Sequence, residues 1–532
     1  MRTKPLRSTR LRAFLLGTLV LSQLLFSCKE SKPGAREEQI TQDSLAETAT
    51  YQEPYRPQFH FSPKEKWMND PNGLVYNDGI YHLFYQYYPE DIVWGPMHWG
   101  HATSKDLFHW EHQPIALYPD ENGYIFSGSA VLDKGNTSGL GTEGIDPLVA
   151  IFTYHDPERA KANTMDHQTQ GIAYSNDNGK TWNKYENNPV LQNPGKMDFR
   201  DPKVFWHEDS NKWVMALAVG DHAEFYSSSD LKNWTFMSEF GKDIGAHGGV
   251  WECPDLIKMK VNGTNEEKWV LLISINPGGP NGGSATQYFV GDFDGASFST
   301  TQKEVKWVDH GADNYAGVTY NNAPDGRHVF LGWMSNWNYA QEVPTEKWRS
   351  AMSLPRELSL GEDENGYFVS SQVLEAFENL TRTVLSRERL SLGDTISLKG
   401  SFDAAEVKWK QNLNQPVEIV FKNEVGEFIR IRLLPENGRI EFDRSKSGKT
   451  GFSDSFADKV HTAPFAPRDA VVDVRMILDR ASLELFVDEG RYVMTEIFFP
   501  GRAYDEMLLY SSANATITDL NINSVSKTWN NE

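Results

Sequence analysis

The sequence predicts an all-β protein in which a β-propeller precedes an antiparallel β-sandwich. Three observations support this: no long helical period after about residue 55, a repeated Asp-led turn in the first two thirds of the chain, and strict apolar–polar alternation in the last third. Short apolar and aromatic runs separated by Gly, Asn, Asp and Pro are typical of all-β folds. A chain of 532 residues is long enough for two domains.

The first 27 residues have the pattern of a secretory signal peptide, because basic residues precede an apolar run, Ala13–Phe26, that is too short to span a membrane comfortably. The run ends at Cys28 in a segment that resembles a bacterial lipobox. We therefore expect a secreted lipoprotein with lipid on Cys28, in the outer membrane and either periplasmic or surface-exposed. An ordinary signal peptide with an incidental Cys is the alternative. Residues 28–54 are polar and predict a flexible tether.

The composition narrows the possible partners. The net charge of -21 argues against nucleic acid, because phosphate binding needs clustered Lys and Arg. The 16 Trp residues suit a sugar site, although all-β cores are also rich in aromatic residues. Cys28 and Cys253 are the two cysteines of the sequence, so a lipid on the first rules out an intrachain disulfide. No H-E-x-x-H motif occurs, and we expect neither a metal nor a cofactor.

The propeller is predicted for residues 55–370. Within it, Asp106, Asp177, Asp230 and a weaker copy at Asp294 each begin a turn that is followed four or five residues later by a large aromatic residue. The copies recur at intervals of about 50 to 70 residues, which fits one four-stranded blade with its loops. Coincidental turn chemistry is the alternative, since Asp-Gly and Asn-Gly turns are common in β proteins.

The pattern changes after the propeller. Residues 372–380 have apolar side chains at helical spacing and predict a short helix within a linker, 371–385. Later runs at 429–433 and 472–476 alternate apolar with charged residues, and 483–487 is expected to alternate in the same way around Glu484 and Phe486. One buried and one solvated face are typical of an antiparallel β-sandwich, which we place at residues 386–532.

Three carboxylates stand in unusual surroundings. Asp70 and Asp201 each precede Pro, which keeps them out of the helical region, and Asn72-Gly73 predicts a tight turn. Glu252 lies between Trp and Cys, so desolvation should raise its pKa and keep a proton available for general acid catalysis. Cleavage of a glycosidic bond needs such an acid and a second carboxylate. Each residue also has a purely structural interpretation. Asp70 could belong to an ordinary turn, Asp201 could form a surface ion pair with Arg200, and Glu252 could face solvent from a strand.

Together the three segments resemble glycoside hydrolase family 32, the invertases, inulinases and levanases. The family signatures W-M-N-D-P-N-G, R-D-P and E-C-P occur in this order and without substitution. The resemblance covers roughly residues 55–530 and includes Phe126–Ala130 and Asp479–Phe486. It implies that the propeller has five blades and that a β-sandwich follows it.

The resemblance also implies roles for individual residues. Asp70 would be the nucleophile, Glu252 the general acid/base, and Asp201 would bind fructose hydroxyls and stabilise the transition state. The substrate-binding residues would be Trp67, Met68, Asn69, Gln86, Trp94, Phe126, Ser127, Arg200, Cys253 and Trp337. Cys253 would tune Glu252 rather than react. For this retaining mechanism we expect the Asp70 and Glu252 carboxyl groups to lie about 5–5.5 Å apart.

Residues 311–319 and 332–339 resemble the exo-acting inulinase and levanase branch. The expected function is therefore release of terminal fructose from levan or inulin and from sucrose. An endo-levanase, an invertase, a fructosyltransferase of the same fold and a non-catalytic fructan-binding lipoprotein are the alternatives. Both β-2,1 and β-2,6 linkages stay open, as does the oligomeric state.

Overall fold

Strands make up nearly all the regular structure of this protein, which is described here from a computed structural model. The structure describes residues 51–142, 144–412, 415–467, 469–513 and 515–529. In these ranges there is one α-helix, α1 (Pro157–Lys161), among 35 strands, which confirms the all-β prediction. The predicted signal peptide, the lipid site Cys28 and the tether up to residue 50 lie outside the described residues. No helix within the described ranges is long and apolar enough to cross a membrane.

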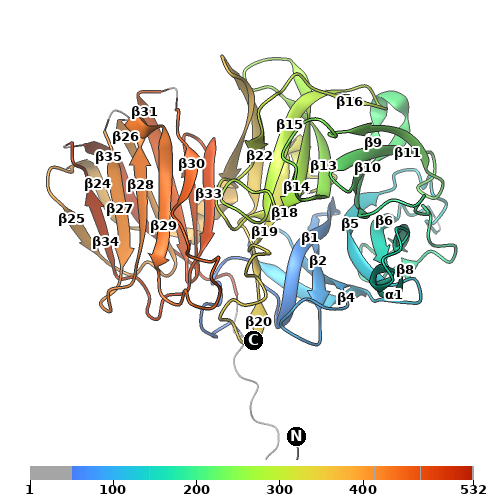
Figure 1. The fold of residues 1–532 in the computed structure, drawn as a ribbon, viewed down its shortest axis with the longest axis horizontal. Helices are drawn as coiled ribbons and strands as arrows, with labels where there is room; N and C mark the ends of the chain where they lie inside the picture. The colour runs from blue at the N-terminus through green and yellow to red at the C-terminus, as the bar shows by residue number, and fades with distance from the viewer. Residues whose placement is uncertain (1–50, 143, 413–414, 468, 514, 530–532) are drawn as a thin grey trace, which may run out of the picture. The chain divides into compact units, whose positions relative to one another are not determined.

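Five sheets of mainly antiparallel strands form the blades of the propeller (Figure 1). The first blade contains β20 (Trp348–Arg349), β1 (Lys66–Asn77), β2 (Ile80–Tyr88), β3 (His98–Ser104) and β4 (Trp110–Leu117). The second contains β5 (Tyr124–Leu132), β6 (Leu148–His155), β7 (Gln168–Ser175) and β8 (Asn183–Lys184). The third contains β9 (Phe199–His207), β10 (Lys212–Val219), β11 (His222–Ser228) and β12 (Thr235–Phe240).

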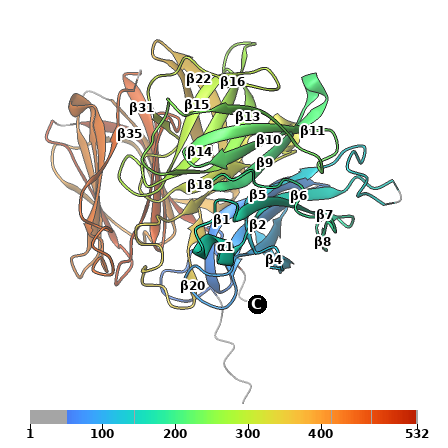
Figure 2. The same ribbon diagram turned by 45° about the vertical axis from the view of Figure 1, so that its right-hand side comes forward.

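The last two blades follow the same plan. The fourth contains β13 (Val250–Lys260), β14 (Glu267–Asn276), β15 (Ala285–Phe293), β16 (Phe298–Ser299) and β17 (Lys306–Trp307). The fifth contains β18 (Tyr315–Thr319), β19 (Val329–Met334), β21 (Ala351–Met352), β22 (Arg356–Asp363) and β23 (Gly366–Val373). The strands β1, β5, β9, β13 and β18 contact one another in this order, and β18 returns to β1, so the propeller closes on itself (Figure 2).

The Asp-led repeats are the turns between the third and fourth strands of four blades. They join β3 to β4, β7 to β8, β11 to β12 and β15 to β16. In the first copy, Ser104 Oγ donates to Asp106 Oδ1 over 3.1 Å, and Asp106 Oδ1 accepts from two backbone N–H groups. A fifth turn of this kind joins β22 to β23, where Asp363 Oδ1 accepts from the Asn365 N–H over 2.6 Å. The repeat therefore identified blades correctly and missed the last one.

Two six-stranded sheets form the sandwich. One contains β24 (Thr381–Ser391), β35 (Thr516–Val525), β26 (Ala405–Asn412), β31 (Val471–Asp479), β32 (Ser482–Val487) and β33 (Tyr492–Ile497). The other contains β25 (Ile396–Lys399), β34 (Glu506–Tyr510), β27 (Val417–Lys422), β28 (Phe428–Leu434), β29 (Arg439–Lys446) and β30 (His461–Pro464). Alternation holds along β27 and β28, where buried and partly exposed residues succeed one another.

One expectation for this region was met only in part, and another was wrong. The segment predicted as a helix begins inside β23 and continues as a 3₁₀-helix, η3 (Glu375–Leu380). The i→i+3 spacing of a 3₁₀ turn places Phe377 and Leu380 on one side, where both are buried. Strand β32 does not alternate, because all of its residues, including Glu484 and Phe486, are buried. Its second face is covered by the propeller rather than by water.

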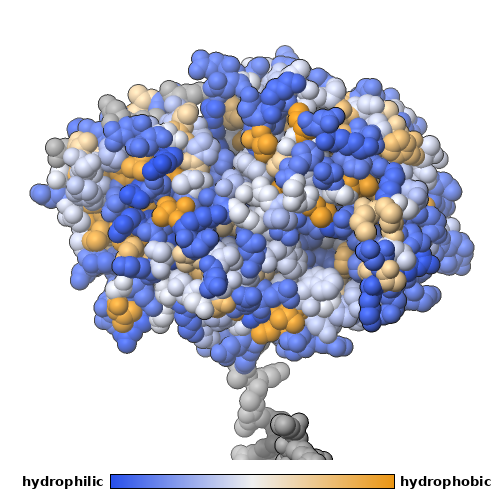
Figure 3. Space-filling model, in the orientation of Figure 1, coloured by the Kyte–Doolittle hydropathy of each residue, from blue (hydrophilic) through white to orange (hydrophobic). Residues whose placement is uncertain are grey.

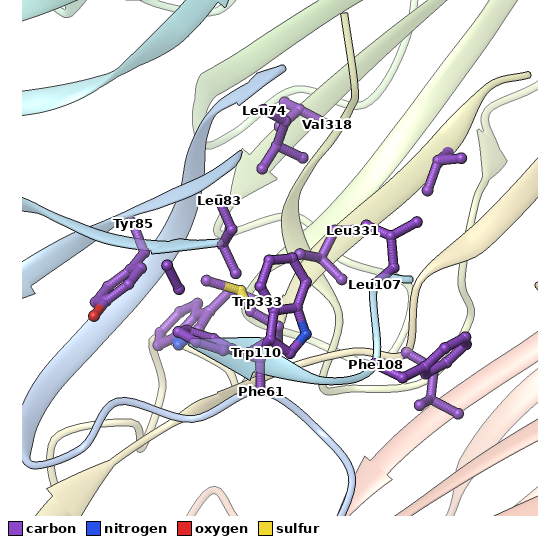
Figure 4. Close-up of a cluster of buried hydrophobic side chains, with 14 of the residues drawn as sticks. Phe61, Leu74, Leu83, Tyr85, Leu107, Phe108, Trp110, Val318, Leu331 and Trp333 are labelled. Atoms are coloured by element: carbon purple, nitrogen blue, oxygen red, sulfur yellow. The ribbon is translucent and has the colours of Figure 1, made fainter. Parts of the chain in front are cut away.

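A shared hydrophobic cluster joins the propeller to the sandwich. Figure 4 shows part of it, with Leu83, Trp110 and Trp333 among the labelled side chains from the first and fifth blades. Ile477 and Phe486 of the sandwich belong to the same cluster. The surface seen in Figure 3 is mostly hydrophilic, with hydrophobic residues scattered over it.

Buried charges cross the same boundary. Arg356 Nη1 donates to Asp309 Oδ2 over 2.8 Å, and its Nε donates to Glu484 Oε2 over 3.0 Å. His60 Nδ1 lies 2.8 Å from Asp479 Oδ2 and its Nε2 lies 2.9 Å from Glu484 Oε1. These five side chains are called the interface cluster below. Asp479 and Glu484 lie in the segment that carries the family resemblance in the last third of the chain, so that segment forms part of the contact between propeller and sandwich.

Candidate active site

A break in strand register interrupts each of the five inner strands of the propeller. The breaks fall between Met68 and Pro71 in β1, Ile125 and Gly128 in β5, Arg200 and Lys203 in β9, Glu252 and Asp255 in β13, and Tyr315 and Val318 in β18. Such β-bulges bend a strand and re-aim its side chains. The residues at or beside these breaks include all three predicted carboxylates.

The backbone at three of these bulges is left-handed without glycine. Asp201 has φ 64, Cys253 has φ 46 and Ala316 has φ 52. Non-glycine residues adopt this region rarely, and it is often found where function requires a strained conformation. The inner strands therefore hold their side chains in positions that a regular strand does not offer.

The tight turn predicted at Asn72-Gly73 is not present, because both residues lie inside β1. Strand β1 pairs with β2 on either side of them, and this pairing outweighs the local turn preference. Gly73 has φ 53, and a Cβ on it would lie 2.7 Å from Phe84 and 2.8 Å from Trp99. Glycine is required here for a bulge packed against two aromatic rings.

A cavity of about 420 Å³ opens at this end of the inner strands. It is lined by Asn69, Asp70, Gln86, Trp94, Phe126, Ser127, His155, His167, Gln168, Asp198, Arg200, Asp201, Glu252, Trp337 and Gln341. The fold thus brings the three predicted carboxylates together from three different blades. Seven predicted binding residues line the same cavity: Asn69, Gln86, Trp94, Phe126, Ser127, Arg200 and Trp337.

Three residues predicted to contact the substrate lie behind the wall instead. Trp67 and Met68 are fully buried in the hydrophobic cluster of the first and fifth blades, and the next two residues, Asn69 and Asp70, line the cavity. Trp67 Nε1 donates to Asn69 Oδ1 over 2.7 Å, so it supports a lining residue. Cys253 is also buried and is not among the residues of the cavity wall.

Hydrogen bonds fix the carboxylate of Asp70. Ser127 Oγ donates to its Oδ2 over 2.6 Å, and Asn69 Nδ2 donates to its Oδ1 over 2.9 Å. Cys253 Sγ lies 3.6 Å from Oδ2. Each oxygen of this group therefore has a polar neighbour that sets its orientation, while the group still faces the cavity.

Arg200 bridges the acidic residues of the site. Its Nη1 donates to Asp198 Oδ1 over 2.6 Å and its Nη2 donates to Glu252 Oε1 over 2.7 Å. Its Nε lies 3.8 Å from Asp201 Oδ2. The Tyr315 hydroxyl donates to the other Glu252 oxygen. The Glu252 side chain remains 21% exposed, so a ligand in the cavity can reach it.

Burial and like charges raise the pKa values of two acids of the site, Asp201 and Glu252. Burial raises the pKa of Asp201 to about 7 against the opposing charge of Arg200, and the nearby charges of Glu252 and Asp70 raise it further. Burial likewise raises the pKa of Glu252, against the lowering effect of Arg200 and with a further contribution from Asp70. A carboxyl group that keeps its proton closer to neutral pH is suited to general acid catalysis.

Cys253 has different partners from those expected. Its backbone N–H donates to Asp201 Oδ2 over 3.0 Å, and its Sγ lies 3.7 Å from the same oxygen. Burial and the surrounding carboxylates raise the pKa of the thiol well above its usual value, so it stays protonated. The contacts of Cys253 are thus with Asp201 and Asp70, rather than with the neighbouring Glu252.

Six residues of the site were not predicted as site residues from the sequence. They are His155, His167, Gln168, Asp198, Tyr315 and Gln341. Asp198 could have been suspected from its position two residues before Arg200. Tyr315 lies in the 311–319 segment that resembles the exo-acting branch, whereas no local pattern marks His155, His167, Gln168 or Gln341.

One group among the described residues has metal-binding spacing, namely His222, Glu224 and Glu239 on the third blade. Lys196 Nζ already donates to Glu224 Oε1 over 2.6 Å, and the Tyr226 hydroxyl donates to Oε2 over 2.6 Å. The buried member of the group is therefore saturated by protein partners. None of the three side chains lines the cavity.

Comparison with known proteins places most of the described region in one family. The chain is 48% identical over 497 residues to a levanase of Bacillus subtilis (strain 168), covering 91% of this chain and 72% of that protein. It matches the crystal structure of an exo-inulinase from Aspergillus awamori with a TM-score of 0.83 at 38% identity, covering 90% of this chain and 100% of that one. A β-fructofuranosidase from Schwanniomyces occidentalis, complexed with fructosyl-erythritol, matches with a TM-score of 0.81 at 34% identity, covering 91% of this chain and 99% of that one.

The family models agree with these similarities. Residues 60–371 match the glycosyl hydrolases family 32 N-terminal domain, and residues 372–524 match the family 32 C-terminal domain. The two matches meet between β22 and η3, within β23 and beside the boundary between the propeller and sandwich sheets. The chain therefore belongs to glycoside hydrolase family 32.

Proposed function

We propose that this protein is a retaining β-fructosidase that releases terminal fructose from fructans and sucrose. The observation that carries the proposal is the convergence of Asp70, Asp201 and Glu252 on one cavity, with Arg200 between two of them. Relatives named levanase, exo-inulinase and β-fructofuranosidase support the substrate class.

In the first step Asp70 attacks the anomeric carbon of the terminal fructose while Glu252 gives its proton to the leaving oxygen. The glycosidic bond breaks, and a covalent fructosyl–Asp70 ester forms. The donors Ser127 and Asn69 hold the attacking carboxylate in place. The raised pKa of Glu252 favours the protonated form that this step requires.

In the second step Glu252, now ionised, takes a proton from water. The resulting hydroxide attacks the anomeric carbon, fructose leaves, and both carboxyl groups return to their starting states. Arg200 donates to Glu252 and so stabilises its ionised form during this half of the cycle. In the proposal Asp201 binds fructose hydroxyls and stabilises the positive charge that develops on the ring.

Lipid attachment at Cys28 belongs to the same proposal. The signal-like segment before it supports export, and similar proteins named extracellular exo-inulinase are consistent with action outside the cell. We infer that the tether after Cys28 holds the catalytic domain at the outer membrane. Labelling with radioactive palmitate, compared with a Cys28→Ala chain, tests this: lipid on the wild-type chain alone supports it, and none on either chain contradicts it.

The time course of products from levan, inulin and sucrose tests the proposed activity. Fructose alone from the first time points supports exo action, whereas early oligosaccharides would show endo action. Longer fructosides formed from concentrated sucrose would show a fructosyltransferase.

An Asp70→Asn variant is the control for the product analysis. It should lose turnover while unfolding at the wild-type temperature, because the amide keeps the shape of the side chain and loses the nucleophile. Binding of levan without any release of fructose by the wild-type protein would favour a fructan-binding role instead.

A further inference from the structure

The second blade supplies a wall of the cavity that the proposed mechanism does not use. Phe126 of β5, His155 at the end of β6 and Gln168 at the start of β7 lie on this wall, together with His167 just before β7. None of them contacts the carboxyl groups of Asp70, Asp201 or Glu252 through a hydrogen bond among the described residues. The question is which part of a substrate this wall would meet.

The ring of His155 is held in one plane and one hydrogen-bonding form. It stacks on Phe126 with ring centroids 4.3 Å apart and an interplanar angle of 7°. Gln168 Nε2 lies 3.3 Å from His155 Nδ1, and since an amide nitrogen only donates, Nδ1 is the acceptor. In the neutral ring the proton then sits on Nε2, for which the described residues provide no partner.

His167 is held in the opposite form. Its Nδ1 lies 2.7 Å from the carbonyl oxygen of Thr164, and because a carbonyl only accepts, Nδ1 carries the proton. In the neutral ring Nε2 is then a free acceptor, with no partner in the described part of the chain. The two rings meet edge to face, with centroids 5.3 Å apart and an interplanar angle of 82°.

A third group on this wall also lacks a partner. Gln168 is 2% exposed, and its Oε1 accepts no hydrogen bond from any described residue. Because this oxygen is itself buried, Gln168 orients His155 rather than meeting a ligand directly. The wall therefore offers one donor, His155 Nε2–H, and one acceptor, His167 Nε2, beside an aromatic ring.

His155 must be neutral for its Nδ1 to accept the hydrogen bond from Gln168. Burial lowers the pKa of His155 to about 4, with the neighbouring His167 and Arg200 lowering it further. At neutral pH the ring is uncharged, and the donor–acceptor pattern suits an uncharged ligand.

We propose that His155 and His167, with Gln168, form the subsite for the leaving-group sugar, the residue on the far side of the bond that is cleaved. A sugar hydroxyl both donates and accepts, so it can accept from His155 Nε2–H and donate to His167 Nε2, while Gln168 holds the His155 ring. The stacked Phe126–His155 pair provides an apolar surface beside these groups. The inference rests on the proposed function, because it assigns a place to the second half of the same substrate.

The test compares two kinds of fructoside in the full chain. Sucrose and inulobiose carry a leaving sugar, whereas methyl β-D-fructofuranoside carries only a methoxy group. His155→Phe and His167→Phe keep an aromatic ring and remove the nitrogen atoms. For each variant, the ratio of kcat/KM for the disaccharide to kcat/KM for the methyl fructoside should fall about tenfold, the effect of losing one buried hydrogen bond. The loss should fall mainly on KM.

The ratio does not depend on how much of a variant is folded, because both substrates are measured on the same enzyme sample. His109→Phe is the matched control, since this histidine lies on a surface turn of the first blade with its side chain 55% exposed, and it should leave the ratio unchanged. Unchanged ratios in both cavity variants, or an equal fall in the control, would overturn the inference. A wild-type protein that hydrolyses none of the three substrates would instead overturn the proposed function.

Discussion

Two clusters of buried charge in this protein behave in opposite ways. In the cavity, Arg200 faces the carboxylates of Asp198, Asp201 and Glu252, with Asp70 nearby, and the pKa values of Asp201 and Glu252 are raised. In the interface cluster, the guanidinium of Arg356 and the imidazole of His60 both lie beside the carboxyl groups.

The carboxyl groups of the interface cluster are correspondingly better compensated. Burial alone would raise the pKa of Glu484, but the charge of Arg356 and the hydrogen bond with His60 lower it to about 2. Both clusters are buried, so burial does not decide the direction of the shift. The number of cations per carboxylate decides it: the interface holds charges that stabilise the fold, and the cavity holds acids whose protonation can change during a reaction.

The largest expected effect comes from Glu252→Gln, which removes the acid from the cavity cluster. We expect kcat for sucrose to fall about 10³-fold, within the usual range for loss of a general acid/base. The alkaline limb of the wild-type pH profile should also flatten, because deprotonation of Glu252 above its raised pKa is what ends activity there. Full activity in the variant would mean that another residue protonates the leaving group.

Removing a cation from the interface cluster should lower the stability of the fold rather than the rate of the reaction. Arg356→Met leaves Glu484 and Asp309 buried without their guanidinium, which should lower the free energy of unfolding by about 3–5 kcal/mol. Urea unfolding measures this. Arg502→Met is the matched control: it breaks an exposed ion pair with Glu424 and should cost less than about 1 kcal/mol. Equal losses in the two variants would show that burial of the pair is irrelevant.

Stability should also fall as the interface histidine loses its proton. Burial alone would lower the pKa of His60, but hydrogen bonds to Asp479 and Glu484 outweigh this and raise it from 6.5 to about 9. A raised pKa means that the stabilisation is complete below pH 6.5 and is lost as the pH rises through 9, an effect on the order of 3 kcal/mol. Chemical unfolding between pH 6 and 10 measures the loss. A His60→Asn variant should show a flatter profile, and a profile as steep as that of the wild type would rule out His60 as its cause.

The smallest expected effect is a gain in stability, caused by removing one carboxylate from the cavity. Asp201→Asn removes a carboxylate whose burial raises its pKa from 3.8 to about 7, so above pH 7 the substitution should stabilise the fold by about 1 kcal/mol or more. At pH 4 Asp201 is protonated in the folded protein and the gain should be much smaller. Thermal unfolding at pH 8 and pH 4 provides the comparison. A variant that is less stable than the wild type at pH 8 would contradict the assignment of Asp201 as an uncompensated acid.

Features that depend on a short stretch of sequence could be predicted from the sequence alone. Blade turns such as the one at Asp106 are short hydrogen-bonded patterns, and alternation along β27 and β28 reflects a strand with one wet face. The three carboxylates were found because each lies in a distinctive segment.

Features that depend on pairing and on distant contacts were not accessible in this way. The bulge that places Asn72-Gly73 inside β1 is set by its register with β2, not by its own residues. His155 and His167 become a pair only because β6 and β7 are paired, which brings the two ends of their connection together at the cavity. The burial of Glu484 depends on the propeller that covers it, so an isolated strand pattern predicts a solvated residue there.

The central claim, a covalent fructosyl–Asp70 intermediate formed with Glu252 as acid, is tested most directly by hydrolysis of sucrose in the presence of methanol. An intermediate that waits for an acceptor can be captured by methanol from the face that water would use, so the product should be methyl β-D-fructofuranoside alone. Appearance of the α-anomer, or no methyl fructoside while fructose is released at the normal rate, would contradict the double displacement.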